Sequence, residues 1–134
     1  MITSQKITII KIRRPISRSL NEELQWLGQS LGLFSSRDKD KSCFRIFVEL
    51  IKGEKKNTHY SSQELAEKAD LARSTVIFHL NKLIESGIVI EDDGRYMLRV
   101  HELSLLINEM KKDIERTMED LKQTASEIDK ILEM

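Results

Sequence analysis

The chain has 134 residues, of which 40% are hydrophobic and 33% charged, with five glycines and a single proline. This length suits one compact domain with an appendage and is too short for two ordinary domains. The composition favours helices and argues against a disordered chain or an all-β sandwich. The one cysteine, Cys43, excludes an internal disulfide, which fits a reducing cytoplasm.

The formal net charge is zero, but the charges are unevenly distributed along the chain. Residues 1–60 carry twelve Lys/Arg against six Asp/Glu, whereas residues 101–134 carry five against nine. A nucleic-acid-binding protein needs positive charge where the phosphates lie, and the total charge can hide it. The alternative is a chance drift of charge along the surface, and the sequence does not decide between the two.

The N-terminal apolar run, residues 7–12, is too short for a signal peptide and is interrupted by a basic residue. No stretch approaches the roughly 20 apolar residues that a membrane-spanning helix needs. We therefore expect a cytoplasmic protein without a membrane partner.

Residues 5–14 alternate loosely and are rich in isoleucine, which predicts a strand or an extended basic arm that ends at Pro15. Its basic residues 11–14 either contact DNA or form the solvated face of an edge strand.

Ser19 and Glu22 then have capping-box spacing, and leucines follow at helical spacing, so we expect an amphipathic helix over about 20–34. Gly28 and Gly32, one turn apart on it, weakly indicate a close helix contact.

A second helix is predicted over about 38–52, with Phe44, Phe47 and Leu50 on its apolar face. Gly53 is expected to end this helix as its C-cap. Cys43 lies beside the apolar face, which favours a core position over a role as a redox sensor. A polar loop is expected at residues 54–58.

Residues 61–86 carry the most informative pattern in the chain. Ser61 and Glu64 have the spacing of a second capping box, which opens a short helix. Residues 70–72 form a tight turn, and a further helix is expected from about Arg73 to Ser86. Such a helix pair can place its second helix in the major groove of DNA, which is roughly 12 Å wide and admits one helix.

A β-hairpin is expected directly after this helix pair. Residues 88–90 read as one strand and residues 95–98 as its return, with the strong hairpin signal Asp93-Gly94 between them. The hairpin can rest on the DNA backbone or minor groove, with Arg95 near its tip. Its turn is acidic, however, and acidic side chains repel phosphate. The elements so far predict a mainly α (α+β) fold, a winged helix-turn-helix.

From about residue 101 the pattern is helical to the end, with an a/d register over about four heptads. A helix of about 32 residues would span roughly 48 Å, more than a small domain can cover. We therefore divide the chain into a winged-helix domain, residues 1–100, and a coiled-coil-like C-terminal dimerisation helix, residues 101–134. A helix folded back on its own domain is the alternative. The predicted homodimer interface comprises Leu24, Leu27, Leu31, Ile107, Met110, Ile114, Leu121 and Ile128.

Residues 61–99, SSQELAEKADLARSTVIFHLNKLIESGIVIEDDGRYMLR, resemble the helix-turn-helix and wing of the arsenical-repressor-like (ArsR-like) winged-helix superfamily. The strongest part is Ser74-Thr75-Val76, followed by His79-Leu80 and Leu83. The resemblance implies a sequence-specific transcriptional regulator that binds double-stranded DNA as a homodimer. The predicted DNA-binding residues are those that the resemblance places toward the groove or a phosphate, together with the hairpin arginine: Arg73, Ser74, Thr75, Ile77, Phe78, Lys82 and Arg95.

Ile77 and Phe78 depart from the family pattern, which usually shows polar or basic side chains there. Apolar groups can contact thymine methyls, so the pair is compatible with reading A·T-rich DNA. The alternative is that both pack on a neighbouring element. Because winged helices also serve as protein-interaction modules, the alternative function is such a module in a larger complex.

No residue pattern indicates an enzyme, a metal site or a cofactor. His59, His79 and His101 are far apart in the sequence, and no cysteine cluster joins them. The resemblance to the arsenical-repressor-like superfamily implies a structural role or a backbone contact for His79. The chain has no phosphate-binding glycine-rich loop, HExxH motif or nucleophile elbow. The sequence does not decide whether the protein senses a small-molecule effector.

Overall fold

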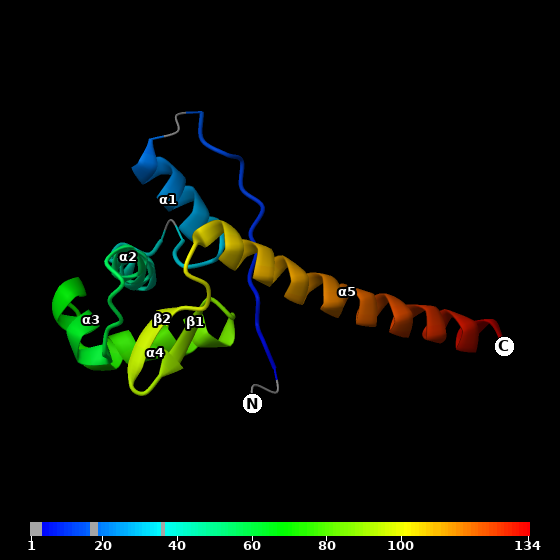
Figure 1. Cartoon of the computed structure of the whole chain (residues 1–134). Coiled ribbons are helices and arrows are strands. Elements are labelled where there is room, and N and C mark those ends of the chain that lie inside the picture. Colours follow the sequence, from blue (N-terminus) through cyan, green and yellow to red (C-terminus); the bar gives the residue numbers. More distant parts are fainter. Residues whose placement is uncertain (1–3, 17–18, 36) are drawn as a thin grey trace. The chain divides into compact units, whose positions relative to one another are not determined.

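The computed structural model describes residues 4–16, 19–35 and 37–134, which divide into two units at Arg99/Val100. Among these described residues, the first unit contains four helices and an antiparallel hairpin, and the second is one long helix (Figure 1). This is the predicted winged helix-turn-helix with a long C-terminal helix. The elements are α1 (Leu20–Ser30), α2 (Ser42–Lys55), α3 (Ser62–Ala69), α4 (Arg73–Glu85), β1 (Val89–Asp92), β2 (Arg95–Leu98) and α5 (Leu103–Glu133).

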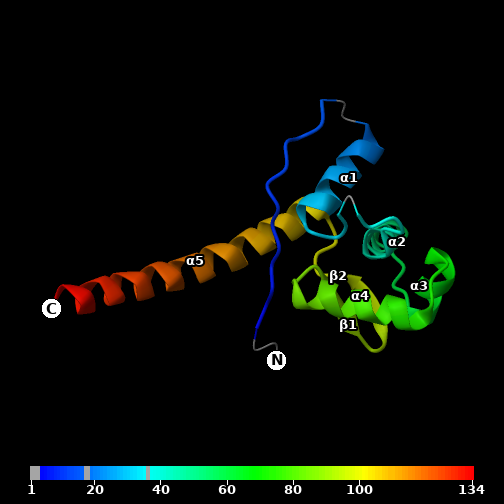
Figure 2. The same ribbon diagram turned by 180° about the vertical axis from the view of Figure 1, so that it is seen from behind.

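The core of the first unit lies where α2, α3 and α4 contact one another. Ile46 and Phe47 from α2, Leu65 from α3 and Leu80 from α4 have no exposed surface. Figure 2 shows the same three helices from behind, with the hairpin beside α4. Because burial of one such side chain contributes about 1.5–3 kcal/mol, this contact holds α4 in a fixed orientation.

Helix α1 is shorter than predicted, because it ends at Ser30 and not near residue 34. Gly32 adopts φ +74°, a left-handed conformation that ends a helix. The backbone N–H of Leu33 then donates to the carbonyl of Gly28 at 2.9 Å, which satisfies a carbonyl near the helix end. The predicted helix was too long because the apolar spacing in the sequence continues beyond Gly32, where the helix has already ended.

Gly28 confirms the expected close contact on α1. A Cβ atom at this position would lie 2.4 Å from Cδ1 of Phe44 on α2. The ring of Phe44 is itself buried and lies 5.1 Å from the ring of Phe34, centroid to centroid. Glycine is thus the residue that lets the Phe44 ring approach the α1 backbone.

Helix α2 differs from its predicted range at both ends. It begins at Ser42, after Lys41 in the left-handed conformation and after a turn in which Oδ1 of Asp38 accepts from the Lys41 N–H. It continues to Lys55, so the prediction of Gly53 as its C-cap is wrong. A Cβ atom on Gly53 would lie 2.8 Å from Cε2 of Tyr60, so this glycine gives room to a buried ring.

The helix-turn-helix pair begins with the predicted capping box on α3. The Ser61 hydroxyl accepts from the Glu64 N–H at 3.1 Å, and the Glu64 carboxylate accepts from the Ser61 N–H at 3.0 Å. Asp70 ends α3 in the left-handed conformation. The Arg45 guanidinium donates to the carbonyl of Ala69, so α2 also holds the end of α3.

The hairpin turn has the predicted geometry. Asp93 and Gly94 both adopt positive φ, 51° and 76°, as a tight two-residue hairpin turn requires. The hairpin is joined to the segment before α3, because Tyr96 donates its N–H to the carbonyl of Tyr60 at 2.7 Å. This bridge fixes the β1–β2 hairpin, the wing of the fold, against the helix-turn-helix pair.

The N-terminal arm, residues 4–16, is extended and forms no strand, which decides between the two predicted conformations. Its backbone is held at two places. The Ile10 N–H donates to the Ser30 carbonyl at 2.8 Å, and the Lys6 N–H donates to the Glu85 carbonyl at 3.1 Å. The arm therefore connects the end of α1 to the end of α4.

Helix α5 is continuous over 31 residues, as the heptad pattern predicted. From Glu115 to the end every side chain is exposed, including Leu121 at 58% and Ile128 at 50%. Within the described residues, no helix is both long and apolar enough to cross a bilayer.

Replacing Gly28 with alanine is expected to destabilise the first unit. Alanine favours the helix by about 1 kcal/mol, but overpacking a buried contact costs about 1–3 kcal/mol. We therefore expect the free energy of unfolding in urea to fall by about 1 kcal/mol. Asn21→Ala, on the exposed surface of the same helix, is the matched control. A G28A variant as stable as the control would contradict the contact.

Candidate nucleic-acid interface

Helix α4 presents one face to solvent and buries the opposite face. Val76, Leu80 and Leu83 are at most 1% exposed. Ser74, Phe78, Asn81 and Glu85 recur at helical spacing on the other side, and all four are exposed. The buried face packs against α2 and α3, so these exposed side chains are the ones that α4 offers to a partner.

Arg73, Ser74 and Thr75 form the first turn of α4, where the sequence predicted groove contacts. Arg73 and Ser74 are exposed, and Thr75 is partly exposed. The Nε of Arg73 donates to the Ser62 hydroxyl at 3.2 Å, which positions this side chain between α3 and α4. The first turn therefore combines short hydroxyl side chains with one anchored cation.

The two apolar residues of α4 differ in exposure. Phe78 is 57% exposed, whereas Ile77 is half-buried. The ammonium of Lys82 lies 4.8 Å from the centroid of the Phe78 ring, a cation–π contact one turn along the helix. Phe78 is thus available to a partner, whereas Ile77 offers less exposed surface.

Asn81 lies on the exposed face of α4 between Phe78 and Glu85 but was not among the predicted DNA-binding residues. An asparagine amide can form two hydrogen bonds to adenine in the major groove. Counting one helical turn at a time from Ser74 would have identified it, because residues seven apart share a face.

Arg95, predicted to contact phosphate from the wing, is engaged within the domain. Its Nη1 atom lies 2.8 Å from the Glu64 carboxylate and 2.9 Å from the His59 carbonyl. The pKa of Glu64 is lowered by the hydrogen bonds from the Ser61 backbone and hydroxyl and, more weakly, by Arg95. Arg95 therefore joins the wing to the capping box of α3.

The tip of the wing is acidic. Glu91, Asp92 and Asp93 are all exposed. Burial, followed by a hydrogen bond with Glu91, raises the pKa of Tyr96. Three exposed carboxylates make this turn unfavourable for phosphate, as the sequence indicated.

The predicted dimer residues fall into two groups. On α1, Leu24 and Leu27 are half-buried and Leu31 is only 7% exposed, so this helix has limited apolar surface to offer. The other five lie on α5 in a single heptad register: Ile107, Met110, Ile114, Leu121 and Ile128. Of these, Met110 is only 2% exposed and Ile114 is half-buried, whereas Ile107, Leu121 and Ile128 are exposed.

Of the residues considered for metal or redox chemistry, Cys43 is buried, His59 and His79 are half-buried, and His101 is exposed. Burial raises the pKa of the Cys43 thiol to about 11, so the thiol is protonated at neutral pH and a poor nucleophile. Burial, followed by the charge of Lys82, lowers the pKa of His79. The described part of the chain holds no cluster of three His, Cys, Asp or Glu residues suited to a metal ion.

Residues 55–90 match the family model described as winged helix-turn-helix DNA-binding. The matched segment runs from the end of α2 through α3 and α4 into β1, so it contains the whole helix-turn-helix pair. Neither the curated proteins nor the solved structures give a match to the chain. The family match and the fold together support a DNA-binding regulator of the winged helix-turn-helix class.

The lowered pKa of Glu64 gives the capping box a defined pH dependence. A carboxyl group whose pKa is lowered on folding stabilises the fold above its ordinary pKa of 4.5, and this stability is lost as the pH falls through the folded pKa. We expect Glu64→Gln to lower the melting temperature at pH 7 and the difference from wild type to close as the pH falls below about 5. Glu119→Gln, exposed on α5, is the control. A difference that stays constant between pH 7 and pH 3 would contradict the assignment.

Proposed function

We propose that this protein is a homodimeric transcriptional regulator that binds specific DNA sequences through α4. The observation that carries the proposal is the solvent face of α4, whose opposite face is fully buried against α2 and α3. A helix held in this way can enter the major groove with a defined set of side chains toward the bases. The family match over residues 55–90 supports DNA as the partner.

Affinity comes from cations on α4 and on the N-terminal arm. Arg73 lies at the start of the helix and Lys82 two turns further on, and both are exposed. The N-terminal arm adds Lys11 and Arg13, which are exposed on its surface. Each such contact with a phosphate releases counterions, so binding weakens as salt rises.

Selectivity comes from the exposed face of α4. Phe78 contacts a thymine methyl, and Asn81 reads an adjacent adenine. Ser74 and Thr75 donate hydrogen bonds at the leading end of the helix. Ile77, which is half-buried, has a secondary role.

The wing supports the helix-turn-helix pair and does not clamp a phosphate. Arg95 bridges the wing to Glu64 on α3, and the carboxylates at the hairpin tip repel the DNA backbone. We place the protein in the arsenical-repressor-like superfamily, although its acidic wing differs from the basic wing expected there.

The homodimer forms through α5. Leu121 and Ile128 are at least half-exposed on a helix with an a/d register, a pattern that pairs with a second copy. Two copies can present their α4 helices about one DNA turn apart, roughly 34 Å, as a palindromic site requires. We place this activity in the cytoplasm and assign it no catalytic step, metal or cofactor.

The second candidate function is a protein-interaction module in a larger complex. The exposed ring of Phe78 and the acidic tip of the wing favour it, because aromatic anchors are common in protein interfaces. The same ring serves both functions, so only the identity of the partner separates them.

Truncating the exposed face of α4 is expected to weaken specific DNA binding. Loss of a good base contact costs about 1–3 kcal/mol, so Phe78→Ala and Asn81→Ala should each lower affinity about 5- to 150-fold for a selected DNA fragment. Electrophoretic mobility shift of fragments selected from a genomic pool measures the change. Glu67→Ala on exposed α3 surface is the control. Unchanged retention of both variants, with capture of a protein partner lost instead, would favour the second candidate.

Charged residues on the a/d face of α5 are expected to dissociate the dimer. Because Leu121 and Ile128 are exposed, Leu121→Asp and Ile128→Asp leave the fold of one chain intact while removing apolar contacts between copies. Sedimentation equilibrium should show wild type as a dimer and the double variant as a monomer. Gln123→Asp, outside the a/d positions, should remain dimeric. A double variant that sediments as a dimer, like the wild type, would exclude the a/d face of α5 as the dimer interface.

A further inference from the structure

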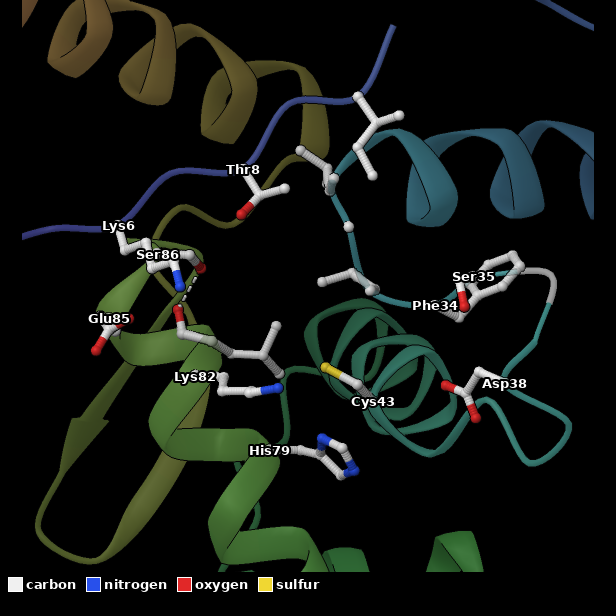
Figure 3. Close-up of a pocket in the computed structure, with 15 residues that line it drawn as sticks. Lys6, Thr8, Phe34, Ser35, Asp38, Cys43, His79, Lys82, Glu85 and Ser86 are labelled. Atoms are coloured by element: carbon white, nitrogen blue, oxygen red, sulfur yellow. Dashed lines mark hydrogen bonds between the residues drawn. The ribbon is translucent and has the colours of Figure 1, made fainter. Parts of the chain in front are cut away.

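The N-terminal arm covers a cavity of about 370 Å³ within the first unit (Figure 3). Its walls come from the arm, the segment after α1, the start of α2 and the C-terminal half of α4. Pockets for small ligands measure about 300–1,000 Å³, so this volume suits a small molecule. Helix α4, which carries the proposed DNA contacts, therefore forms one wall of a space of ligand size.

The arm is held across this cavity by contacts at both ends. Gln5 donates its side-chain amide to the Ser86 carbonyl at 3.1 Å, beside the backbone hydrogen bond from Lys6 to Glu85. Toward the other end, Thr8 contacts Gly32, where a Cβ atom would lie 2.7 Å from the threonine methyl. The wall that the arm provides is therefore a built part of the unit.

One side of the cavity is apolar. Leu31 and Leu33 are each 7% exposed, Leu83 is 1% exposed, and all three line the cavity. Cys43, whose thiol is protonated, also lines the cavity. Aliphatic walls of this kind favour a hydrocarbon group over a sugar or a nucleotide base.

The cavity is also lined by two cations that form no ion pair within the described residues. Lys6 and Lys82 both line the cavity, and neither forms an ion pair with any residue that the structure describes. Figure 3 shows the Lys82 ammonium pointing toward Cys43, above His79. The Nδ1 atom of His79 is buried and makes no hydrogen bond within the described chain.

Two carboxylates, Asp38 and Glu85, also line the cavity, and neither forms an ion pair with Lys6 or Lys82 within the described residues. The Oδ1 atom of Asp38 accepts from the Lys41 N–H. Burial and then the charge of Lys82 lower the pKa of His79, and the charge of Asp38 raises it to a smaller extent. Glu85 extends away from His79 and Cys43 in Figure 3. Since buried polar atoms are normally hydrogen-bonded, an acceptor on a ligand can complete Nδ1 of His79 in the tautomer that carries its proton there.

We propose that the arm-covered cavity binds a small monocarboxylate with an aliphatic body. The carboxylate lies between the Lys82 ammonium and Nδ1 of His79, and the hydrocarbon lies against Leu31, Leu33 and Leu83. A carboxylate supplies the negative charge and the hydrogen-bond acceptors that these two groups lack.

Ligand binding also lowers DNA affinity, a part of the inference that rests on the proposed function. Lys82 and His79 both stand on α4, so a bound carboxylate neutralises a cation that otherwise faces phosphate. The bound acid then weakens DNA binding, and bound DNA weakens acid binding by the same factor.

Isothermal titration of the whole protein with hexanoate and 4-methylpentanoate tests the cavity without DNA. We expect saturable binding of one acid per chain, and binding of hexanamide at least about tenfold weaker, since the amide lacks the charge. Lys82→Met should weaken the acids by about tenfold or more, and so should Lys6→Met to a lesser extent. Lys52→Met, on exposed α2 surface outside the cavity, should bind as wild type.

The His79 imidazole resonances provide a second readout, because only a ligand inside the cavity shifts them. Absence of saturable binding by both acids, or equal binding by Lys82→Met and wild type, would overturn the inference. If the acids bind as expected but no DNA is retained under any condition, the proposed function fails while the cavity assignment stands. If DNA is retained and the acids do not bind, the cavity assignment alone fails.

Discussion

The burial of one face of α4 against α2 and α3 is the constraint on which the rest of the molecule depends. Val76, Leu80 and Leu83 fill the space between these helices, and their removal from water fixes the rotation of α4 about its axis. That rotation alone determines that Ser74, Phe78 and Asn81 face outward. A helix free to rotate would present no defined surface to a base sequence.

The peripheral elements act mainly to hold this arrangement. The wing is tied to the segment before α3 by the Tyr60–Tyr96 bridge and to α3 by the pair of Arg95 with Glu64. The N-terminal arm is hydrogen-bonded to the ends of α1 and α4. Cations that the sequence offered for phosphate binding are thus partly used inside the fold, which concentrates the proposed DNA contacts on α4 and the surface of the arm.

Local signals made much of the fold predictable. The capping box at Ser61, the hairpin turn at Asp93-Gly94 and the heptads of α5 each depend on residues close in sequence, and all three elements were correctly placed. The end of α1 and the role of Gly53 were not, because they depend on positive φ at Gly32 and on space for the Tyr60 ring. The engagement of Arg95 and the arm-covered cavity likewise arise from contacts between distant segments. Asn81 was the exception, since helical spacing alone reveals its exposure.

The central claim is that α4, and not the wing, reads DNA. The most direct measurement is the change in backbone amide resonances of the full chain when a retained DNA fragment is titrated in. The largest shifts are expected at Ser74, Phe78 and Asn81, with Asp92 and Gly94 nearly unchanged. Large shifts at the wing tip with an unperturbed α4 would contradict the claim.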